Sequence, residues 1–224
     1  MKDNSRQGFV IGLTGKMAAG KNFVTDTLSH LADSLFQENG KTLCIDADKL
    51  VHQVLESESC RKKILETFSP IAEQMGIEIL GSDGQINRRE LAKIVFSSKE
   101  NLDKQENIIH PEVEGILQKL IKENPDKIII VNATVLYKIP LAKTCDALIF
   151  VDCPTLTRFF RAKKRDGLPA RQILERFRSQ KHLFAKYKKL NADIYRVRNF
   201  GSKRTLEKQI SKILESITGF QKSN

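Results

Sequence analysis

A chain of 224 residues, 40% of them hydrophobic and 29% charged, has the composition of an ordinary soluble protein and can bury one good core. No apolar run approaches the ~20 residues that a membrane span needs, and the N-terminus shows no signal-peptide pattern. The four cysteines have no C-x-x-C spacing and the four histidines form no i, i+4 pair, which disfavours a zinc site. We therefore expect a cytoplasmic protein with no membrane partner.

The net charge of +11 is concentrated in one segment. From Arg158 to Lys189, twelve Lys or Arg residues stand against Asp166 and Glu175, so this segment carries +10 and all other residues together about +1. A basic protein would ordinarily be expected to bind nucleic acid or an anionic membrane. The concentration of positive charge in this segment instead indicates one basic functional segment, in a chain whose other charges nearly cancel.

The first predicted element is an apolar strand at 9–14, which leads into the sequence GKMAAGKN at 15–22. Gly15 and Gly20 allow the backbone to curl around an anion and to turn successive N–H groups inward, and Lys21 adds a positive charge for the outer phosphates. Apolar residues at helical spacing follow the loop. A strand before and a helix after are what a phosphate-binding loop requires, so a plain glycine turn with a surface lysine is the lesser alternative.

The residue after Lys21 departs from this motif. A hydroxyl that holds Mg²⁺ normally stands there, whereas this chain has Asn22. Because an amide carbonyl is also a hard oxygen ligand, the metal role can survive the change. We therefore predict ATP and Mg²⁺ as cofactors, with Asn22 as the candidate metal ligand.

A second strand is predicted at 41–46, followed by the sequence Asp46-Ala47-Asp48 and a helical pattern. Carboxylates at the carboxyl end of a parallel strand point into the crevice where ligands bind in α/β sheets. Asp48 could equally be only the cap of the following helix, and the two roles are compatible.

The next part of the chain reads as a helical insertion on the substrate side, at about 51–125. Its strongest helix is 107–121, where apolar residues form one stripe. A short β-like stretch at 77–80 precedes a turn at 81–84.

Further apolar runs complete an alternating pattern of strands and helices: strands at 127–132 and 146–152, an edge strand at 192–197, and a closing amphipathic helix at 206–217. This alternation predicts an α/β fold with a doubly wound parallel sheet. No linker or internal repeat is visible, so we expect one kinase-like domain spanning 1–224. Its core is assigned to 8–50, 126–157 and 190–218.

The basic segment, about 158–189, splits at 166–169 into two helical halves, which is the form of a helical hairpin lid. In phosphoryl transfer the developing negative charge spreads over equatorial oxygens, and arginines brought over the nucleotide stabilise it. The alternative is a solvated charged face. Because such a face usually mixes the two signs and this one scarcely does, the pattern favours a lid.

Taken together, these features resemble the dephospho-coenzyme A kinase family over nearly the whole chain. Each matching stretch is weak alone, but their order and spacing together are specific. The stretches are 11–15 with 20–21, 45–48, 84–91 with 95–96, 109–111, 150–154, 161–167, Gln180, 192–193, Asn199 and Gly201.

The resemblance implies a role for particular residues. Asp48 would take the proton from the acceptor hydroxyl, with Lys21, Arg161 and Arg165 completing the catalytic set. Arg88, His110 and Pro111, with Asp48, would line the substrate side. The ATP-binding residues would be Gly15, Ala18, Ala19, Gly20, Lys21, Asn22, Phe23 and Asn199.

This chain departs from the family pattern at three places. Asn22 replaces Ser or Thr, and the loop residues 16–19 are less rich in glycine than usual. After the central strand, the family's Asp-Ile-Pro-Leu-Leu-Phe-Glu is matched by residues 132–138, which include Thr134 and Lys138 where substrate contacts would fall.

The residues alone predict a phosphotransferase that moves the γ-phosphoryl group of MgATP in line to a hydroxyl. The family resemblance makes that hydroxyl the ribose 3′-OH of dephospho-CoA, so the product would be coenzyme A. The alternative is a nucleoside monophosphate or other small-metabolite kinase of the same architecture. A P-loop NTPase that binds nucleic acid through the basic segment is the weaker alternative, so we expect no nucleic-acid partner, and the sequence names no protein partner.

Overall fold

The structure is a computed structural model and describes residues 8–37, 40–82, 84–190 and 192–219. The chain divides into two compact units. The sheet unit comprises the described parts of Met1–Asp46 and Leu120–Asn224, and the insertion unit comprises those of Ala47–Lys119. The insertion unit falls close to the helical insertion expected at 51–125, while the assignment of 1–224 to a single domain stays a prediction.

The sheet unit contains a five-stranded sheet, in which every pair of neighbouring strands is parallel and the order is β2-β3-β1-β4-β5. The expected parallel α/β sheet is therefore confirmed. Its strands are β1 (Phe9–Gly15), β2 (Thr42–Asp46), β3 (Ile128–Asn132), β4 (Ala147–Asp152) and β5 (Ile194–Arg198).

Central strands of a parallel sheet are covered on both faces, and they therefore read as continuous apolar runs. Strand β1 lies between β3 and β4, with Ile11 opposite Ile130 on one side and Ala147 on the other. All five residues of β3 are buried. The edge position expected for the strand at 192–197 is confirmed by β5, which pairs only with β4 in the described sheet.

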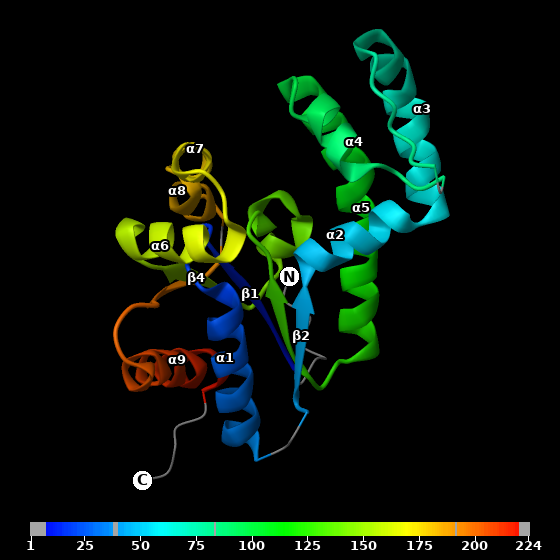
Figure 1. The fold of residues 1–224 in the computed structure, drawn as a ribbon. Helices are drawn as coiled ribbons and strands as arrows, with labels where there is room; N and C mark the ends of the chain where they lie inside the picture. Colours follow the sequence, from blue (N-terminus) through cyan, green and yellow to red (C-terminus); the bar gives the residue numbers. More distant parts are fainter. Residues whose placement is uncertain (1–7, 38–39, 83, 191, 220–224) are drawn as a thin grey trace. The chain divides into compact units, whose positions relative to one another are not determined.

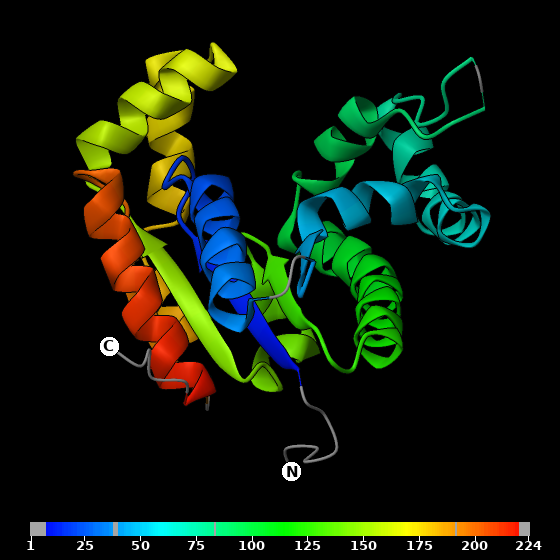
Figure 2. The same ribbon diagram turned by 90° about the horizontal axis from the view of Figure 1, so that it is seen from below.

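Helices α1 (Lys21–Phe36) and α9 (Lys203–Thr218) lie on the same face of the sheet (Figure 2). They are the helix expected after the phosphate loop and the expected closing helix. Buried side chains at helical spacing join both helices to the strands in one core. From the helices this core includes Val24, Leu28, Ala32, Leu206, Ile210, Ile213 and Leu214.

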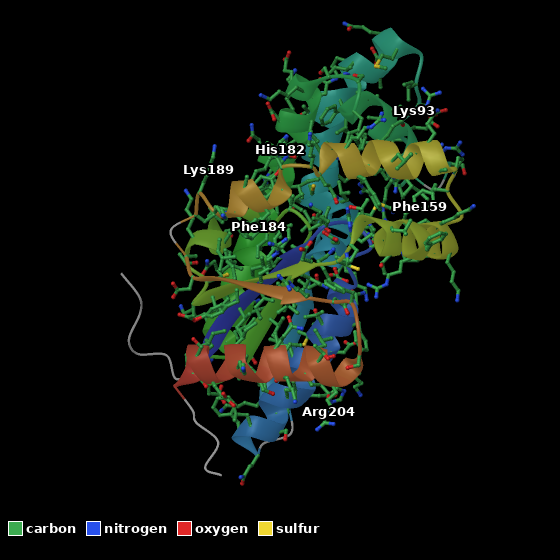
Figure 3. The ribbon with its side chains drawn as sticks, turned by 90° about the vertical axis from the view of Figure 1, so that its left-hand side faces the viewer. Lys93, Phe159, His182, Phe184, Lys189 and Arg204 are labelled. Carbon is green, nitrogen blue, oxygen red and sulfur yellow. The ribbon has the colours of Figure 1, made fainter. Side chains whose placement is uncertain are left out.

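The opposite face of the sheet is covered by short helical elements, namely η1 (Leu136–Lys138), η2 (Pro140–Lys143) and α8 (Leu183–Tyr187). Aromatic rings make this contact. The Phe150 ring of β4 meets the ring of Phe184 at a centroid distance of 4.8 Å and that of Tyr187 at 6.1 Å, both edge to face. Figure 3 shows Phe184 on α8 above the strands.

The basic segment forms α6 (Thr155–Asp166), α7 (Ala170–Ser179) and α8. The break expected at 166–169 is confirmed, because α6 ends before Gly167 and α7 begins after Pro169. The hairpin is followed by a third helix, α8, which the two-helix prediction did not include. Figure 1 shows α6 next to the N-terminal end of α1, where the phosphate loop enters that helix.

The insertion unit is mostly helical, as expected. Its helices are α2 (Ala47–Glu56), α3 (Glu58–Met75), α4 (Arg88–Val95) and α5 (Lys99–Glu123), the last of which continues beyond the unit. The β-like stretch at 77–80 forms no strand, since only Leu80 makes an isolated antiparallel bridge, to Ile86. Asp83, in the turn predicted there, lies outside the described residues. No helix in the described part of the chain is long and apolar enough to cross a membrane.

Candidate active site

The phosphate loop has the context that its motif requires. It leaves β1 at Gly15 and enters α1 through Gly20, which is the N-terminal cap of that helix. Gly20 has a left-handed backbone with φ of 84°, and a Cβ atom there would overlap the Asn199 amide nitrogen. Both facts require glycine at this position.

The N-terminus of α1 is suited to binding an anion. Gly20 offers no capping side chain to the N–H groups of the first turn, and that turn contains no acidic residue. An uncapped helix N-terminus presents backbone N–H groups and the positive end of the helix dipole. Lys21 and Asn22 are the first two residues of this turn, followed by Phe23, whose side chain is exposed. The local structure is therefore that of a phosphate-binding loop.

Two predicted residues meet at the back of this loop. The buried Asn199 side chain donates through Nδ2 to the backbone oxygens of Ala19, at 2.8 Å, and Gly20, at 3.3 Å. Arg161 of α6 donates through Nη1 to the same backbone oxygen of Ala19 and to the backbone oxygen of Asn199, both at 3.4 Å. Asn199 and Arg161 therefore hold the loop from outside, through its carbonyl groups.

Arg165, one turn further along α6, makes a different contact. Its guanidinium donates to both carboxylate oxygens of Asp166, at 2.6 and 2.9 Å. This hydrogen bonding raises the pKa of Arg165 and lowers that of Asp166. Arg161 thus lies against the loop, whereas the side chain of Arg165 is directed to its own neighbour.

Two amides meet at the carboxyl end of β3. Asn132 donates from Nδ2 to Asn22 Oδ1 at 2.9 Å, and the Asn132 Oδ1 atom is buried without a hydrogen-bond partner. Asn132 lies opposite Asp46 of β2 in the sheet register. Among the described residues no group of three or more His, Cys, Asp or Glu is arranged to hold a metal ion. The amide oxygens of Asn22 and Asn132 are the hard oxygen atoms that this pair brings to the edge of the sheet.

A buried tyrosine that the sequence analysis did not identify links the basic segment to the loop strand. The Tyr187 hydroxyl of α8 accepts a hydrogen bond from Thr14 Oγ1 at 2.7 Å and donates one to the Thr134 oxygen at 3.2 Å. Desolvation by burial raises its pKa, so the hydroxyl stays protonated and able to donate. Thr14 immediately precedes the loop, so Tyr187 joins the basic segment to strand β1, which leads into the phosphate loop.

The residues expected on the substrate side all belong to the insertion unit. Asp48 is exposed and is the second residue of α2, inside its first turn rather than at the cap position. Arg88 begins α4 and forms an ion pair with Glu56 of α2. His110 and Pro111 lie within α5. The residues expected to bind ATP belong to the sheet unit, so the two predicted sets occupy different units.

The sheet order, the loop between β1 and α1, and the helical segment with arginine against that loop define a P-loop kinase. Solved structures support this fold. A dephospho-CoA kinase from Campylobacter jejuni superposes with a TM-score of 0.60 at 23% identity, covering 94% of this chain and 97% of its own. A shikimate kinase from Acinetobacter baumannii gives a TM-score of 0.52 at 15% identity, covering 97% of each chain.

Sequence comparison identifies the family within that class. The profile of the dephospho-CoA kinase family matches residues 9–202. The dephospho-CoA kinase of Treponema denticola is 36% identical over 93% of this chain and 90% of its own length, and that of Fusobacterium nucleatum is 32% identical over 93% and 98%. The chain belongs to the dephospho-CoA kinase family, and it is accordingly an ATP-dependent phosphotransferase.

Proposed function

We propose that this protein transfers the γ-phosphoryl group of MgATP to the ribose 3′-OH of dephospho-CoA and so forms coenzyme A. The observation that carries this proposal is the family match along nearly the whole chain. It is supported by a phosphate loop that leads into an uncapped helix N-terminus, as binding of ATP phosphates requires. We also propose that the protein works in the cytoplasm.

On the nucleotide side, the loop amides and Lys21 would bind the ATP phosphates. Asn199 and Arg161 bind the Ala19 carbonyl of the loop, which would help to keep the loop in shape. Arg161 and Arg165 lie four residues apart on α6, so both can face a nucleotide bound at the loop. Their charges would then stabilise the transferring phosphoryl group.

On the acceptor side, Asp48 would accept the proton of the ribose hydroxyl as it attacks. Its exposed position in the first turn of α2 suits an ionised carboxylate, because the positive end of the helix dipole favours negative charge there. Arg88, His110 and Pro111 would bind the rest of dephospho-CoA. Most of the rate enhancement would come from positioning and charge stabilisation, since phosphoryl transfer needs little covalent chemistry from the protein.

The amide pair at the end of β3 fits a Mg²⁺ ion. Asn22 Oδ1 and the unpartnered, buried Asn132 Oδ1 are hard oxygens of the type that Mg²⁺ binds. The ion, when bound, would neutralise charge on the ATP phosphates. We propose Asn22 and Asn132 as its nearest protein groups, either direct or through water.

Metal demand is therefore expected to be high, because these two groups are neutral. Asn132→Asp adds a negative charge and Asn22→Ser restores the hydroxyl that normally holds Mg²⁺, so each should lower several-fold the Mg²⁺ concentration that gives half-maximal rate, without abolishing activity. The measurement is the initial rate as a function of Mg²⁺ at fixed ATP. Asn124→Asp is the matched control, since that amide donates to the Leu120 oxygen elsewhere in the sheet unit. An unchanged Mg²⁺ dependence in both variants would remove these amides from the metal's surroundings.

The test of the acceptor is a panel assayed with MgATP that includes dephospho-CoA, AMP, CMP and shikimate. Dephospho-CoA should give a kcat/KM at least ~10²-fold above that of the other acceptors. A difference of this size is expected when a poorer acceptor leaves polar groups of the binding site without hydrogen-bond partners. A preference for AMP or CMP would instead make the chain a nucleoside monophosphate kinase. Salt-dependent binding of nucleic acid without phosphorylation of any acceptor would favour the nucleic-acid alternative.

A further inference from the structure

Both backbone polar groups of one loop residue are held by the basic segment. The Met17 N–H donates to Gln180 Oε1 at 2.7 Å, and the Met17 oxygen accepts from Arg158 Nη1 at 3.3 Å. Arg158 belongs to α6, and Gln180 directly follows α7. We refer to these two hydrogen bonds as the Met17 clamp.

The residue next to the clamp has an unfavourable backbone. Ala18 has φ of 59°, in the left-handed region that residues with a Cβ atom rarely adopt. The other non-glycine residue with positive φ in the described chain is Gln37, which caps the C-terminus of α1, where such a backbone is common. Ala18 lies in the middle of the phosphate loop, so its strain must be supported by the structure around it.

Side-chain packing provides part of that support. Ala162 of α6 and Ile173 and Phe177 of α7 form a small buried cluster, and Met17 and Ala18 pack against it. Figure 3 shows α6 and α7 one above the other, with Phe159 labelled between them. Met17 and Ala18 are therefore part of the small hydrophobic core of the basic segment as well as of the phosphate loop.

Arg158 is an unusual residue to find in that core. It is only 3% exposed, its guanidinium lies 4.2 Å from the centre of the Phe177 ring, and its Nε–H has no hydrogen-bond partner. No carboxylate of the described chain pairs with it: its other hydrogen bond goes to Thr155 Oγ1 at 3.4 Å. Burial lowers its pKa. Burying a guanidinium without an ion-pair partner and with an unsatisfied N–H carries a desolvation cost, which offsets what its contacts with Phe177, Thr155 and Met17 contribute to stability.

We propose that Arg158 and Gln180 are positioning residues for nucleotide binding, which act by holding Met17 so that Ala18 keeps its left-handed conformation and the loop N–H groups stay arranged for phosphate. The buried charge of Arg158, directly behind the loop, also favours an anion in front of it. This inference rests on the proposed binding of ATP at the loop. It explains how the loop keeps its shape without the usual number of glycines.

The test measures nucleotide affinity and stability separately in the full-length protein. Arg158→Met should raise the Kd for MgADP, measured by isothermal titration calorimetry, by about 10-fold, the loss expected for one charged hydrogen bond. Its melting temperature should change little, because removal of the buried unpaired charge offsets the loss of its hydrogen bonds and of the contact with Phe177. Gln180→Met should raise the Kd to a similar extent. Arg178→Met, at an exposed arginine of α7, is the matched control and should leave the Kd unchanged.

A second substitution tests the link to Ala18. Glycine populates left-handed backbone readily, so in an Ala18→Gly protein the loop needs less support. Adding Arg158→Met to that protein should then raise the Kd by no more than about 3-fold. A full 10-fold effect in both backgrounds, or no effect of Arg158→Met and Gln180→Met in the native loop, would overturn the inference. If the unmodified protein binds no MgADP, the proposed function itself fails.

Discussion

Asp48→Asn is expected to lower kcat by ~10² to 10⁴ and to change the KM for either substrate little. Asparagine keeps the size of the side chain but cannot accept the proton of an attacking hydroxyl, so the loss should appear in the chemical step. The measurement is steady-state kinetics with MgATP and dephospho-CoA. It addresses the role that family resemblance implies for an exposed carboxylate in the first turn of α2.

The control for Asp48 uses the same change elsewhere in the insertion unit. Asp103→Asn, at an exposed position of α5, should retain the unmodified kcat. A variant with Asp48→Asn that keeps full activity would reduce Asp48 to a residue that stabilises the start of its helix.

The second large effect concerns the basic segment. Arg161→Ala should lower kcat by ~10² or more, because its charge would act on the transition state while its guanidinium also supports the loop through Ala19. Arg165→Ala should have a loss of similar size, although Arg165 pairs with Asp166 in this structure. Both losses are measured as kcat at saturating substrates, with melting temperatures to show that the fold is kept.

Arg171→Ala is the control for these two variants, since Arg171 is an exposed residue of α7 whose ion pair is with Glu175. Exposed pairs of this kind contribute little to stability. If Arg161→Ala and Arg165→Ala raise only the KM for ATP by a modest factor, the two arginines attract the nucleotide and do not act on the transition state.

The sequence was sufficient where the pattern is local. The apolar runs predicted the sheet because buried parallel strands have few polar residues, and the glycines with Lys21 predicted the loop because few sequences can curl around phosphate. The break between α6 and α7 followed from Gly167 and Pro169. In each case the physical requirement falls on residues that are close together in the chain.

Local patterns were misleading where tertiary contacts decide the structure. The helix expected at 107–121 begins instead at Lys99, and its first turns are polar. Asn101 anchors this extension, since its buried side chain donates to the Ile94 oxygen at 3.1 Å and to Ser97 Oγ at 3.2 Å. The β-like stretch at 77–80 has no partner strand in the described chain beyond the bridge at Leu80.

The site residues that the sequence analysis missed are those whose partners are distant in the chain. Arg158 lies 141 residues from Met17, and Tyr187 lies 173 residues from Thr14. In the sequence, Arg158 was only one of twelve basic residues in its segment, and nothing distinguished it from the exposed ones. Its burial against the loop, which gives it a role, exists only in the folded sheet unit.

The most direct test of this account is the product formed from dephospho-CoA and MgATP, followed by ³¹P NMR. The proposed function predicts one new phosphomonoester at the ribose 3′ position for each ADP released, and no ADP release beyond background when dephospho-CoA is omitted. ADP formation that does not depend on dephospho-CoA, or a phosphoryl group placed on any other atom of it, would contradict the central claim.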